Sequence, residues 1–239
     1  MIFAAGLGTR LQPLTNDRPK ALVEVNGLCL LEIALQKLIA SGCDHAIINV
    51  HHFADMVIDF LKKKNNFGIK ISISDERSML LETGGGLKKA KRYFQDAPFI
   101  IYNTDIITNL NIRDLYSAHL KSNAIATLAV RNRNTSRYLL FDKENYQLKG
   151  WTNKKTAECK WSTPSSGDEL PFAFSGIQVV SPEIFKYIPR KKVFSTIELY
   201  LEAAKDSFIK AYPHDEDIWI DAGKPNDLEE AKKILKDVL

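Results

Sequence analysis

A glycine-rich loop directly after an N-terminal apolar segment constrains the fold of this 239-residue chain more than any other feature. Met1–Ala5 is apolar and is followed by Gly6-Leu7-Gly8-Thr9-Arg10. A buried strand that ends in such a loop is typical of α/β proteins that bind anions, because glycine lets backbone N–H groups approach a phosphate closely. Thr9 and Arg10 add side-chain donors, and Lys20 adds a second cation for a polyphosphate. The sequence therefore predicts a phosphate site at the end of the first strand.

This loop differs from two common phosphate-binding motifs. The GxxxxGK[ST] spacing of a P-loop is missing. A dinucleotide-binding GxGxxG motif requires glycine at position 11, where this chain has Leu11. The loop therefore indicates phosphate binding of another kind.

The first half of the chain predicts a parallel, doubly wound sheet. Short apolar runs alternate with longer amphipathic segments, in the β-α-β order typical of such sheets. The expected strands are 1–5, 46–50, 69–74 and 98–102, and the expected helices are 28–41, 54–64 and 85–94.

The second half is less regular. A hairpin is expected between 137–142 and 147–151, and the polar stretch 152–168 is expected to be a loop. The other expected strands are 124–130, 172–180 and 208–212, and the other expected helices are 182–187, 195–205 and 225–238. Since no linker is apparent, we predict a single domain over 1–239, with halves 1–122 and 123–239, the second being an insertion on the same sheet.

Composition excludes several classes of protein. The net charge of +4 is too small to indicate binding to nucleic acid or an anionic membrane. Three widely spaced cysteines form neither a disulfide framework nor a CxxC site, which favours a reducing compartment. No apolar run approaches the roughly 18 residues of a membrane span. The apolar N-terminus runs straight into a charged loop, unlike a signal peptide, so we expect a cytoplasmic protein.

The N-terminal motif continues to residue 22 and resembles that of the sugar-1-phosphate nucleotidyltransferases. Residues 6–22 are GLGTRLQPLTNDRPKAL, similar to the family pattern GxGTRLxPLTxxxPKxL. These enzymes join a sugar 1-phosphate to a nucleoside triphosphate (NTP) and release pyrophosphate. The resemblance covers essentially the whole chain. It implies an α/β, Rossmann-like, doubly wound and mostly parallel mixed sheet of the glycosyltransferase-A-like kind, with 1–122 as the nucleotide-binding half and 123–239 as a sugar-binding insertion.

The resemblance also implies roles for residues of the motif. Arg10 stabilises the leaving pyrophosphate and Lys20 contacts the phosphates at the reacting centre, so these two are the catalytic candidates. The nucleotide-binding candidates of this segment are Ala4, Ala5, Gly6, Gly8, Thr9 and Arg10.

A second segment, Leu81-Glu82-Thr83-Gly84-Gly85-Gly86, precedes an expected helix. Its glycines expose backbone that can accept a flat base at close range, although a flexible loop and helix start explain them as well. In the family this segment lies against the nucleobase, which assigns Thr83, Gly84 and Gly85 to nucleotide binding. The form LETGGG is similar to the N-acetylmuramate-1-phosphate uridylyltransferases of cell-wall recycling and favours UTP as the nucleotide.

Two aspartates are candidate Mg²⁺ ligands. Asp105 follows an expected strand, in Asn103-Thr104-Asp105, and ligands of open α/β sheets bind at such strand ends. Asp221 lies in the segment WIDAGKP, similar to the family's Trp-x-Asp-x-Gly-x-Pro. A helix cap and a surface turn are the structural alternatives. The resemblance implies that both bind Mg²⁺, and it places glycine where this chain has Thr104, a change that costs backbone freedom.

The candidates for substrate binding are weaker. Asn103 lies two positions before Asp105, the first candidate metal ligand, and Ser175 and Gly176 lie in a strand that a core position explains equally well. Glu158 lies in the variable stretch 150–170, whose role stays open. The adjacent His51 and His52 point to opposite sides of a strand, which favours a structural role over metal binding.

The implied reaction uses an NTP and a sugar 1-phosphate with Mg²⁺, and no nucleic acid or membrane partner. N-acetylmuramate 1-phosphate with UTP is the favoured pair. The same chemistry with mannose or heptose 1-phosphate and GTP, glucose 1-phosphate and dTTP, or phosphocholine and CTP stays open. A non-catalytic nucleotide-sugar sensor is the other alternative, and the presence of Arg10, Lys20, Asp105 and Asp221 together disfavours it. We expect a monomer or a homodimer.

Overall fold

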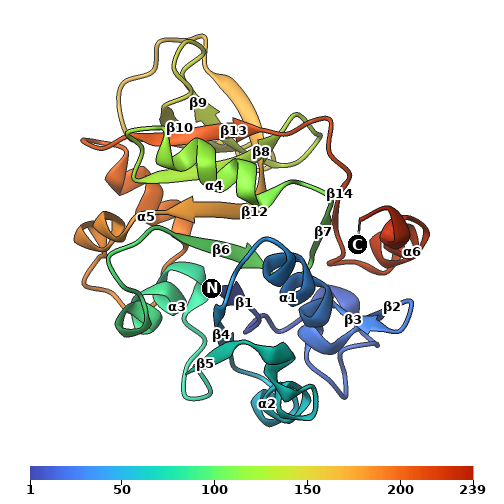
Figure 1. Ribbon diagram of the computed structural model, residues 1–239. Helices are drawn as coiled ribbons and strands as arrows, with labels where there is room; N and C mark the ends of the chain where they lie inside the picture. Colours follow the sequence, from blue (N-terminus) through green and yellow to red (C-terminus); the bar gives the residue numbers. More distant parts are fainter. Residues whose placement is uncertain (239) are drawn as a thin grey trace. The chain divides into compact units, whose positions relative to one another are not determined.

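The computed structural model describes residues 1–238, and its contacts divide the chain into two compact units built from separate stretches of sequence (Figure 1). Unit 1 comprises Met1–Leu81, Tyr102–Ile112 and Asp217–Leu239. Unit 2 comprises Glu82–Ile101 and Arg113–Glu216. The single domain with halves meeting at residue 122 stays a prediction.

Unit 1 contains a parallel sheet in which β1 lies between β4 and the end of β6. Its strands are β1 (Ile2–Phe3), β4 (His45–Val50), β5 (Lys70–Asp75) and the last two residues of β6 (Phe99–Asn103). Ile2 pairs with Ile48 on one side and Tyr102 on the other, and all three are buried. Parallel strands covered on both faces are continuous apolar runs, which is why these short segments were recognisable.

Short antiparallel pairs complete unit 1. Strand β7 (Ile106–Thr108) pairs with β14 (Trp219–Asp221), with Asp221 opposite Ile106, and β2 (Glu24–Val25) pairs with β3 (Leu28–Cys29). The β7–β14 pair brings two segments more than 100 residues apart to one place, directly after β6.

The helices of unit 1 are α1 (Leu30–Ala40), α2 (Ala54–Lys63) and α6 (Pro225–Ile234). Leu228 of α6 packs into an apolar cluster with Leu30 of α1, Ile107 of β7 and Leu11. Leu11 belongs to the glycine-rich motif and is fully buried, so this cluster anchors the motif. Burying a leucine side chain contributes about 1.5–3 kcal/mol.

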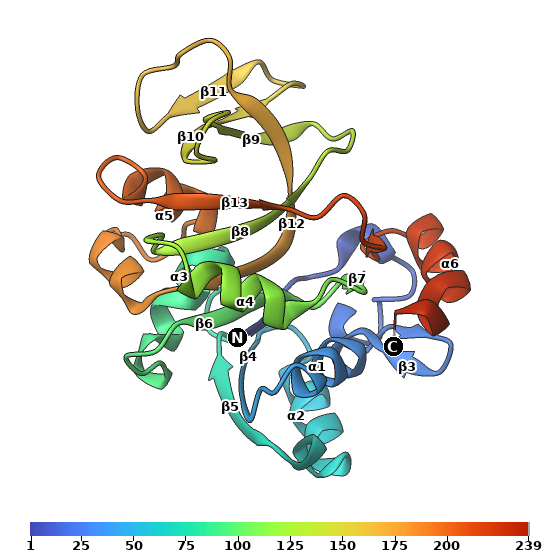
Figure 2. The ribbon, with the colours of Figure 1, turned by 45° about the horizontal axis from the view of Figure 1, so that its top comes forward.

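Unit 2 is mainly antiparallel, in the strand order β11, β10, β9, β12, β8 and β13 (Figure 2). Only the β8–β13 pair among these is parallel. The strands are β8 (Ala126–Arg131), β9 (Arg137–Phe141), β10 (Leu148–Asn153), β11 (Glu158–Trp161), β12 (Leu170–Val180) and β13 (Ile209–Pro213).

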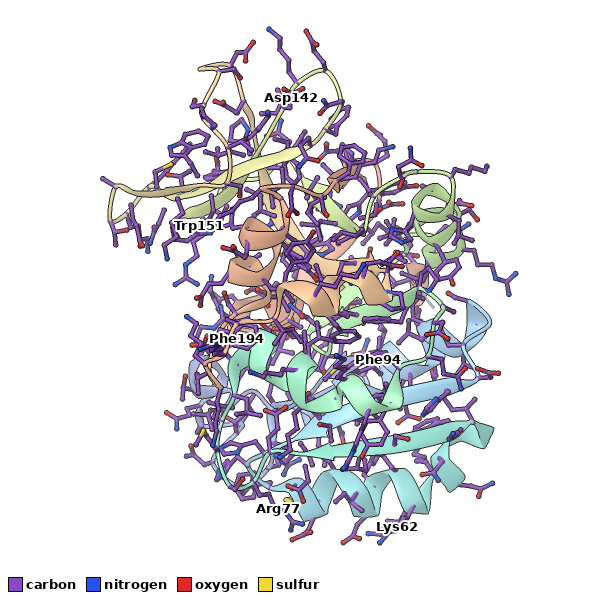
Figure 3. All side chains as sticks on the ribbon, turned by 90° about the vertical axis from the view of Figure 1, so that its left-hand side faces the viewer. Lys62, Arg77, Phe94, Asp142, Trp151 and Phe194 are labelled. Atoms are coloured by element: carbon purple, nitrogen blue, oxygen red, sulfur yellow. The ribbon has the colours of Figure 1, made fainter. Side chains whose placement is uncertain are left out.

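The helices of unit 2 are α3 (Glu82–Ala90), α5 (Thr196–Ala203) and, from its second residue on, α4 (Ile112–Leu120). Helix α5 begins with a capping box, in which the Ser195 side chain accepts from the N–H of Glu198 and the Glu198 side chain accepts from the N–H of Ser195. Phe194, just before this cap, lies beside the start of α3 (Figure 3).

The α/β class with a mixed sheet and flanking helices is confirmed. Three expectations were wrong in detail. The stretch 152–168 is not all loop, because its residues extend β10 and form β11. Helix α3 begins at Glu82 rather than 85, so Thr83 and the glycines lie inside it. Leu28 and Cys29 form β3 rather than a helix start. Within residues 1–238, every helix is too short or too polar to cross a lipid bilayer.

The capping box gives a test of stability. Ser195→Ala removes the side-chain acceptor of α5 and is expected to lower the free energy of unfolding by about 1 kcal/mol. For a chain of this size, that loss corresponds to a drop in Tm of roughly 2–4 °C, measured by thermal unfolding. Ser78→Ala, at an exposed loop position, is the matched control and should leave Tm unchanged. Equal Tm values for both variants would contradict the capping role.

Candidate functional site

The glycine-rich motif folds back on itself at Gly8, in unit 1. Gly8 adopts the left-handed region, with φ of 69°, and a Cβ there would lie 2.9 Å from Cγ2 of Thr15 and 3.0 Å from Cβ of Lys20. The Thr15 hydroxyl donates to the Gly8 carbonyl at 2.9 Å. Only glycine fits this position, because both the backbone conformation and the space exclude a side chain. The fold of the motif thereby places Lys20 beside the loop that carries Arg10.

Lys20 forms an ion pair with Asp105. Lys20 begins a short 3₁₀ turn after Pro19, and Asp105 lies in the turn between β6 and β7. The two side chains are only 14% and 16% exposed, so the pair is largely desolvated. Breaking such a pair is costly, because removing either side chain leaves the other as an uncompensated buried charge.

Asp221 completes the cluster from the end of β14. The N–H of Ala222 donates to the Asp105 carbonyl at 2.8 Å, which holds the two aspartate segments together. A Cβ on buried Gly223 would lie 2.6 Å from Oδ1 of Asp221, 2.7 Å from Nη2 of Arg10 and 3.2 Å from Nζ of Lys20. Three charged side chains therefore converge on the one face that Gly223 leaves bare.

The pKa values of the two carboxyl groups are shifted in opposite directions. Burial disfavours the charge of Asp105, but the Lys20 ammonium and hydrogen bonds outweigh it and hold the pKa of Asp105 below its ordinary value. Burial and the charge of Asp105 raise the pKa of Asp221 above its ordinary value. A second cation next to both carboxylates would relieve this repulsion.

The donor set fits Mg²⁺. Oδ1 of Asp221 is buried and has no hydrogen-bond partner among the described residues, and the Asp105 carboxylate is its neighbour. Mg²⁺ binds through one or two carboxylates and completes its octahedron with water and phosphate oxygens. Within residues 1–238 no group of three or more His, Cys, Asp or Glu side chains could hold a metal by itself. Two carboxylates that leave room for phosphate oxygens are what a substrate-bridging ion needs.

Thr104 has a structural role that the sequence did not indicate. Its hydroxyl donates to the Phe3 carbonyl at 2.6 Å, and its N–H donates to the same oxygen at 3.3 Å. Asn103, in the register position opposite Phe3, is half-buried. The threonine therefore ties the end of β6 to the end of β1, immediately before the glycine-rich loop.

The candidates in unit 2 have protein partners of their own. Oγ1 of Thr83 accepts from the N–H of Thr196 at 2.9 Å, and the N–H groups of Gly84 and Gly85 donate to the Phe194 carbonyl at 2.9 and 3.1 Å. A Cβ on Gly84 would lie 2.4 Å from the Phe194 ring. Close packing against Phe194 therefore explains glycine at position 84, while the contact with a base stays a prediction.

The remaining substrate candidates are not all together. Buried Ser175 forms a hydrogen bond of 2.7 Å between its Oγ and Nε2 of His214, and Gly176 has φ of 80°, both in the irregular part of β12. Glu158 lies on β11, exposed and paired with Lys160, and β10 and β9 separate β11 from β12. The structure thus joins Ser175 with Gly176 and places Glu158 elsewhere in unit 2.

A family model described as nucleotidyl transferase matches residues 1–238. The chain belongs to the nucleotidyl transferase family. The family predicted from the motif is confirmed, and the enzyme class with it.

Three relatives show how this nucleotidyl transferase compares with other members. It is 33% identical over 231 residues to an N-acetylmuramate alpha-1-phosphate uridylyltransferase of Caulobacter vibrioides, covering 94% of this chain and 91% of the relative. It is 27% identical to a UTP–glucose-1-phosphate uridylyltransferase of Synechocystis and 29% identical to a mannose-1-phosphate guanyltransferase of Yarrowia lipolytica, in each case over 95% of this chain. The chain spans only 60% and 61% of the length of the latter two.

Solved structures support the fold. HddC from Yersinia pseudotuberculosis superposes with a TM-score of 0.78 at 25% identity, covering 98% of this chain and 97% of HddC. An inositol-1-phosphate CTP transferase from T. maritima gives a TM-score of 0.79 at 16% identity, covering 99% and 94% of the two chains. The second likeness concerns the fold alone.

The raised pKa of Asp221 predicts that this carboxylate lowers the stability of the protein. Since its folded-state pKa lies above the unfolded value, ionised Asp221 destabilises the fold at pH above that folded pKa. Asp221→Asn should therefore raise Tm at pH 7 in the absence of divalent ions, and the gain should shrink as the pH falls toward the ordinary aspartate pKa.

The candidate role of Asp221 as a Mg²⁺ ligand predicts that the same Asp221→Asn variant loses most of its turnover. The exposed Asp96→Asn is the control for both measurements. A lower Tm for Asp221→Asn would show that the carboxylate stabilises the fold, and near-normal turnover would exclude its role as a metal ligand.

Proposed function

We propose that this nucleotidyl transferase transfers UMP from UTP to N-acetylmuramate 1-phosphate and releases pyrophosphate. The convergence of Arg10, Lys20 and Asp221 on Gly223, with Asp105 paired to Lys20, carries the reaction class. Two cations and two carboxylates gathered around Gly223 suit a nucleoside triphosphate with its metal ion. The LETGGG segment and the 33% identity to an N-acetylmuramate alpha-1-phosphate uridylyltransferase support the substrate pair.

The residues of the cluster act by positioning and charge. A phosphate oxygen of the sugar 1-phosphate attacks the α-phosphorus in line, and this oxygen is already anionic at neutral pH, so no general base is needed. Arg10, which is exposed on the loop, stabilises the charge of the leaving pyrophosphate, and Lys20 contacts the phosphates at the reacting centre. Mg²⁺, held by Asp105 and Asp221, would supply charge neutralisation between phosphate oxygens.

Other substrate pairs are the second candidate. The similarity to a UTP–glucose-1-phosphate uridylyltransferase and to a mannose-1-phosphate guanyltransferase supports glucose 1-phosphate with UTP and mannose 1-phosphate with GTP. The sugar-contacting residues under the favoured proposal are Asn103, Ser175, Gly176 and Glu158, and the base-contacting residues are Thr83, Gly84 and Gly85.

A substrate grid tests the proposal. Pyrophosphate release is measured with Mg²⁺ for the four NTPs and for a panel of sugar 1-phosphates that includes N-acetylmuramate 1-phosphate. Release confined to UTP with N-acetylmuramate 1-phosphate is the expected result and assigns the enzyme to peptidoglycan recycling. Release with another pair would overturn the substrate assignment, and NTP binding without release would favour a sensor.

Arg10 provides a test that separates the two substrates. Arg10→Ala should lower kcat/KM for the NTP by about 10²–10³-fold, because the cation acts on charge that develops on the leaving group. The KM for the sugar 1-phosphate should change little. Lys62→Ala on α2, where the side chain is 72% exposed, is the control and should match the wild type. A raised KM for the sugar 1-phosphate with an unchanged KM for the NTP would contradict a role at the pyrophosphate.

A further inference from the structure

A buried hydrogen-bond chain ends at Ala4, the first residue after β1 and two positions before the glycine-rich loop. The N–H of Ala4 donates to Oδ1 of Asn49 at 2.7 Å, and Nδ2 of Asn49 donates to Oε1 of Glu76 at 2.8 Å. Asn49 is 3% exposed and Glu76 is 0% exposed. All three residues belong to unit 1. Polar groups this deeply buried are costly unless they are paired, so their pairing restricts the local structure.

The backbone of Glu76 is fixed by its own neighbours. Its N–H donates to the Val50 carbonyl at 2.7 Å. Its carbonyl accepts from Nδ1 of His51 at 2.7 Å and from the N–H of Met79 at 3.0 Å. This contact gives His51 the structural role that its sequence context indicated. The carboxylate of Glu76 is therefore presented to Asn49 from a rigid point at the ends of β4 and β5.

Glu76 determines which way the Asn49 amide faces. Oε1 of Glu76 accepts from the NH₂ group of Asn49, which leaves the amide oxygen to accept from the N–H of Ala4. The opposite orientation would place two donors face to face at Ala4. On its other side, the adjoining Phe3 carbonyl accepts from Thr104. The entry to the loop is thus held from β4 and from β6.

We propose that Asn49 and Glu76 are positioning residues that set the path of the loop from Ala4 to Arg10 and thereby the affinity for the NTP. Neither residue touches the phosphates on this proposal. The inference rests on the proposed function in one respect, namely that this loop holds the NTP phosphates. It adds two residues that the motif does not contain and that lie 45 and 72 positions beyond Ala4.

Swapping the amide and the carboxyl group between positions 49 and 76 tests the proposal. Asn49→Asp keeps the acceptor for Ala4 but sets a carboxylate against Glu76. Glu76→Gln keeps an acceptor for Asn49. The double variant Asn49→Asp/Glu76→Gln restores one donor and one acceptor at that contact, because the glutamine amide can donate to the new carboxylate.

Steady-state kinetics should separate the variants. Asn49→Asp is expected to raise the KM for the NTP by about 10-fold or more, the size expected for a disrupted buried hydrogen bond. Its kcat should change much less, because the path of the loop affects how tightly the NTP phosphates bind and not the reacting atoms. Glu76→Gln alone and the double variant should both stay within about threefold of the wild-type KM.

Rescue distinguishes positioning from general damage to the fold. A wild-type KM in Asn49→Asp, or a raised KM in the double variant at wild-type Tm, would overturn the proposal. Where Asn49→Asp does not fold, Asn49→Ser takes its place, since serine is too short to bridge Ala4 and Glu76. Thermal unfolding is measured for every variant.

A readout without nucleotide separates this inference from the proposed function. Amide hydrogen exchange of residues 1–11 should be faster in Asn49→Asp than in the wild type, and the double variant should restore protection. Restored protection in a protein that binds no NTP would overturn the function and leave the positioning contact intact. Unchanged protection in Asn49→Asp would overturn the positioning role whatever the enzyme's substrate.

Discussion

The ion pair between Lys20 and Asp105 is the contact on which the functional site depends. It joins the end of the glycine-rich motif to the turn after β6, and the β7–β14 pairing adds Asp221 from near the C-terminus. Two desolvated charges are expensive, and the gain from pairing them rarely exceeds that cost. Under the proposed function, the pair holds charge ready for phosphates, and its contribution to stability is secondary.

The shape of the cluster depends on missing side chains. Gly8 lets the two parts of the motif touch, and Gly223 leaves the face on which Arg10, Lys20 and Asp221 converge. A Cβ at either position would lie within 3.0 Å of a neighbouring atom. Glycine loses more backbone entropy on folding than other residues, so each of these glycines lowers stability. In return, their missing side chains let the charged groups lie close together.

The parallel strands could be predicted because they depend on local apolar patterns, and the members of the charged cluster could be named because the family resemblance implies them. The apolar runs of β1, β4 and β6 are short and continuous, and Arg10, Lys20, Asp105 and Asp221 each lie in a distinctive motif. Other features depend on contacts between distant residues. Glycine is required at position 84 by the Phe194 ring, which lies 110 positions later in the sequence. Thr104 stands where the family has glycine, and its hydroxyl donates to the distant Phe3 carbonyl. Strand β11 carries only exposed residues, so no apolar pattern marked it.

Asn49 and Glu76 show why such contacts escape a motif. Each lies at the end of an ordinary strand, and neither has chemistry that marks a site when considered alone. Their role follows from the register of β1 with β4, which places Phe3 opposite Asn49. The next N–H along the chain, that of Ala4, therefore reaches the amide oxygen of Asn49. A glycine-rich loop binds an anion more tightly when its entry is fixed, because otherwise part of the binding free energy is lost in ordering the loop. The parallel sheet thus supplies, through two buried polar side chains, the rigidity that the glycines cannot.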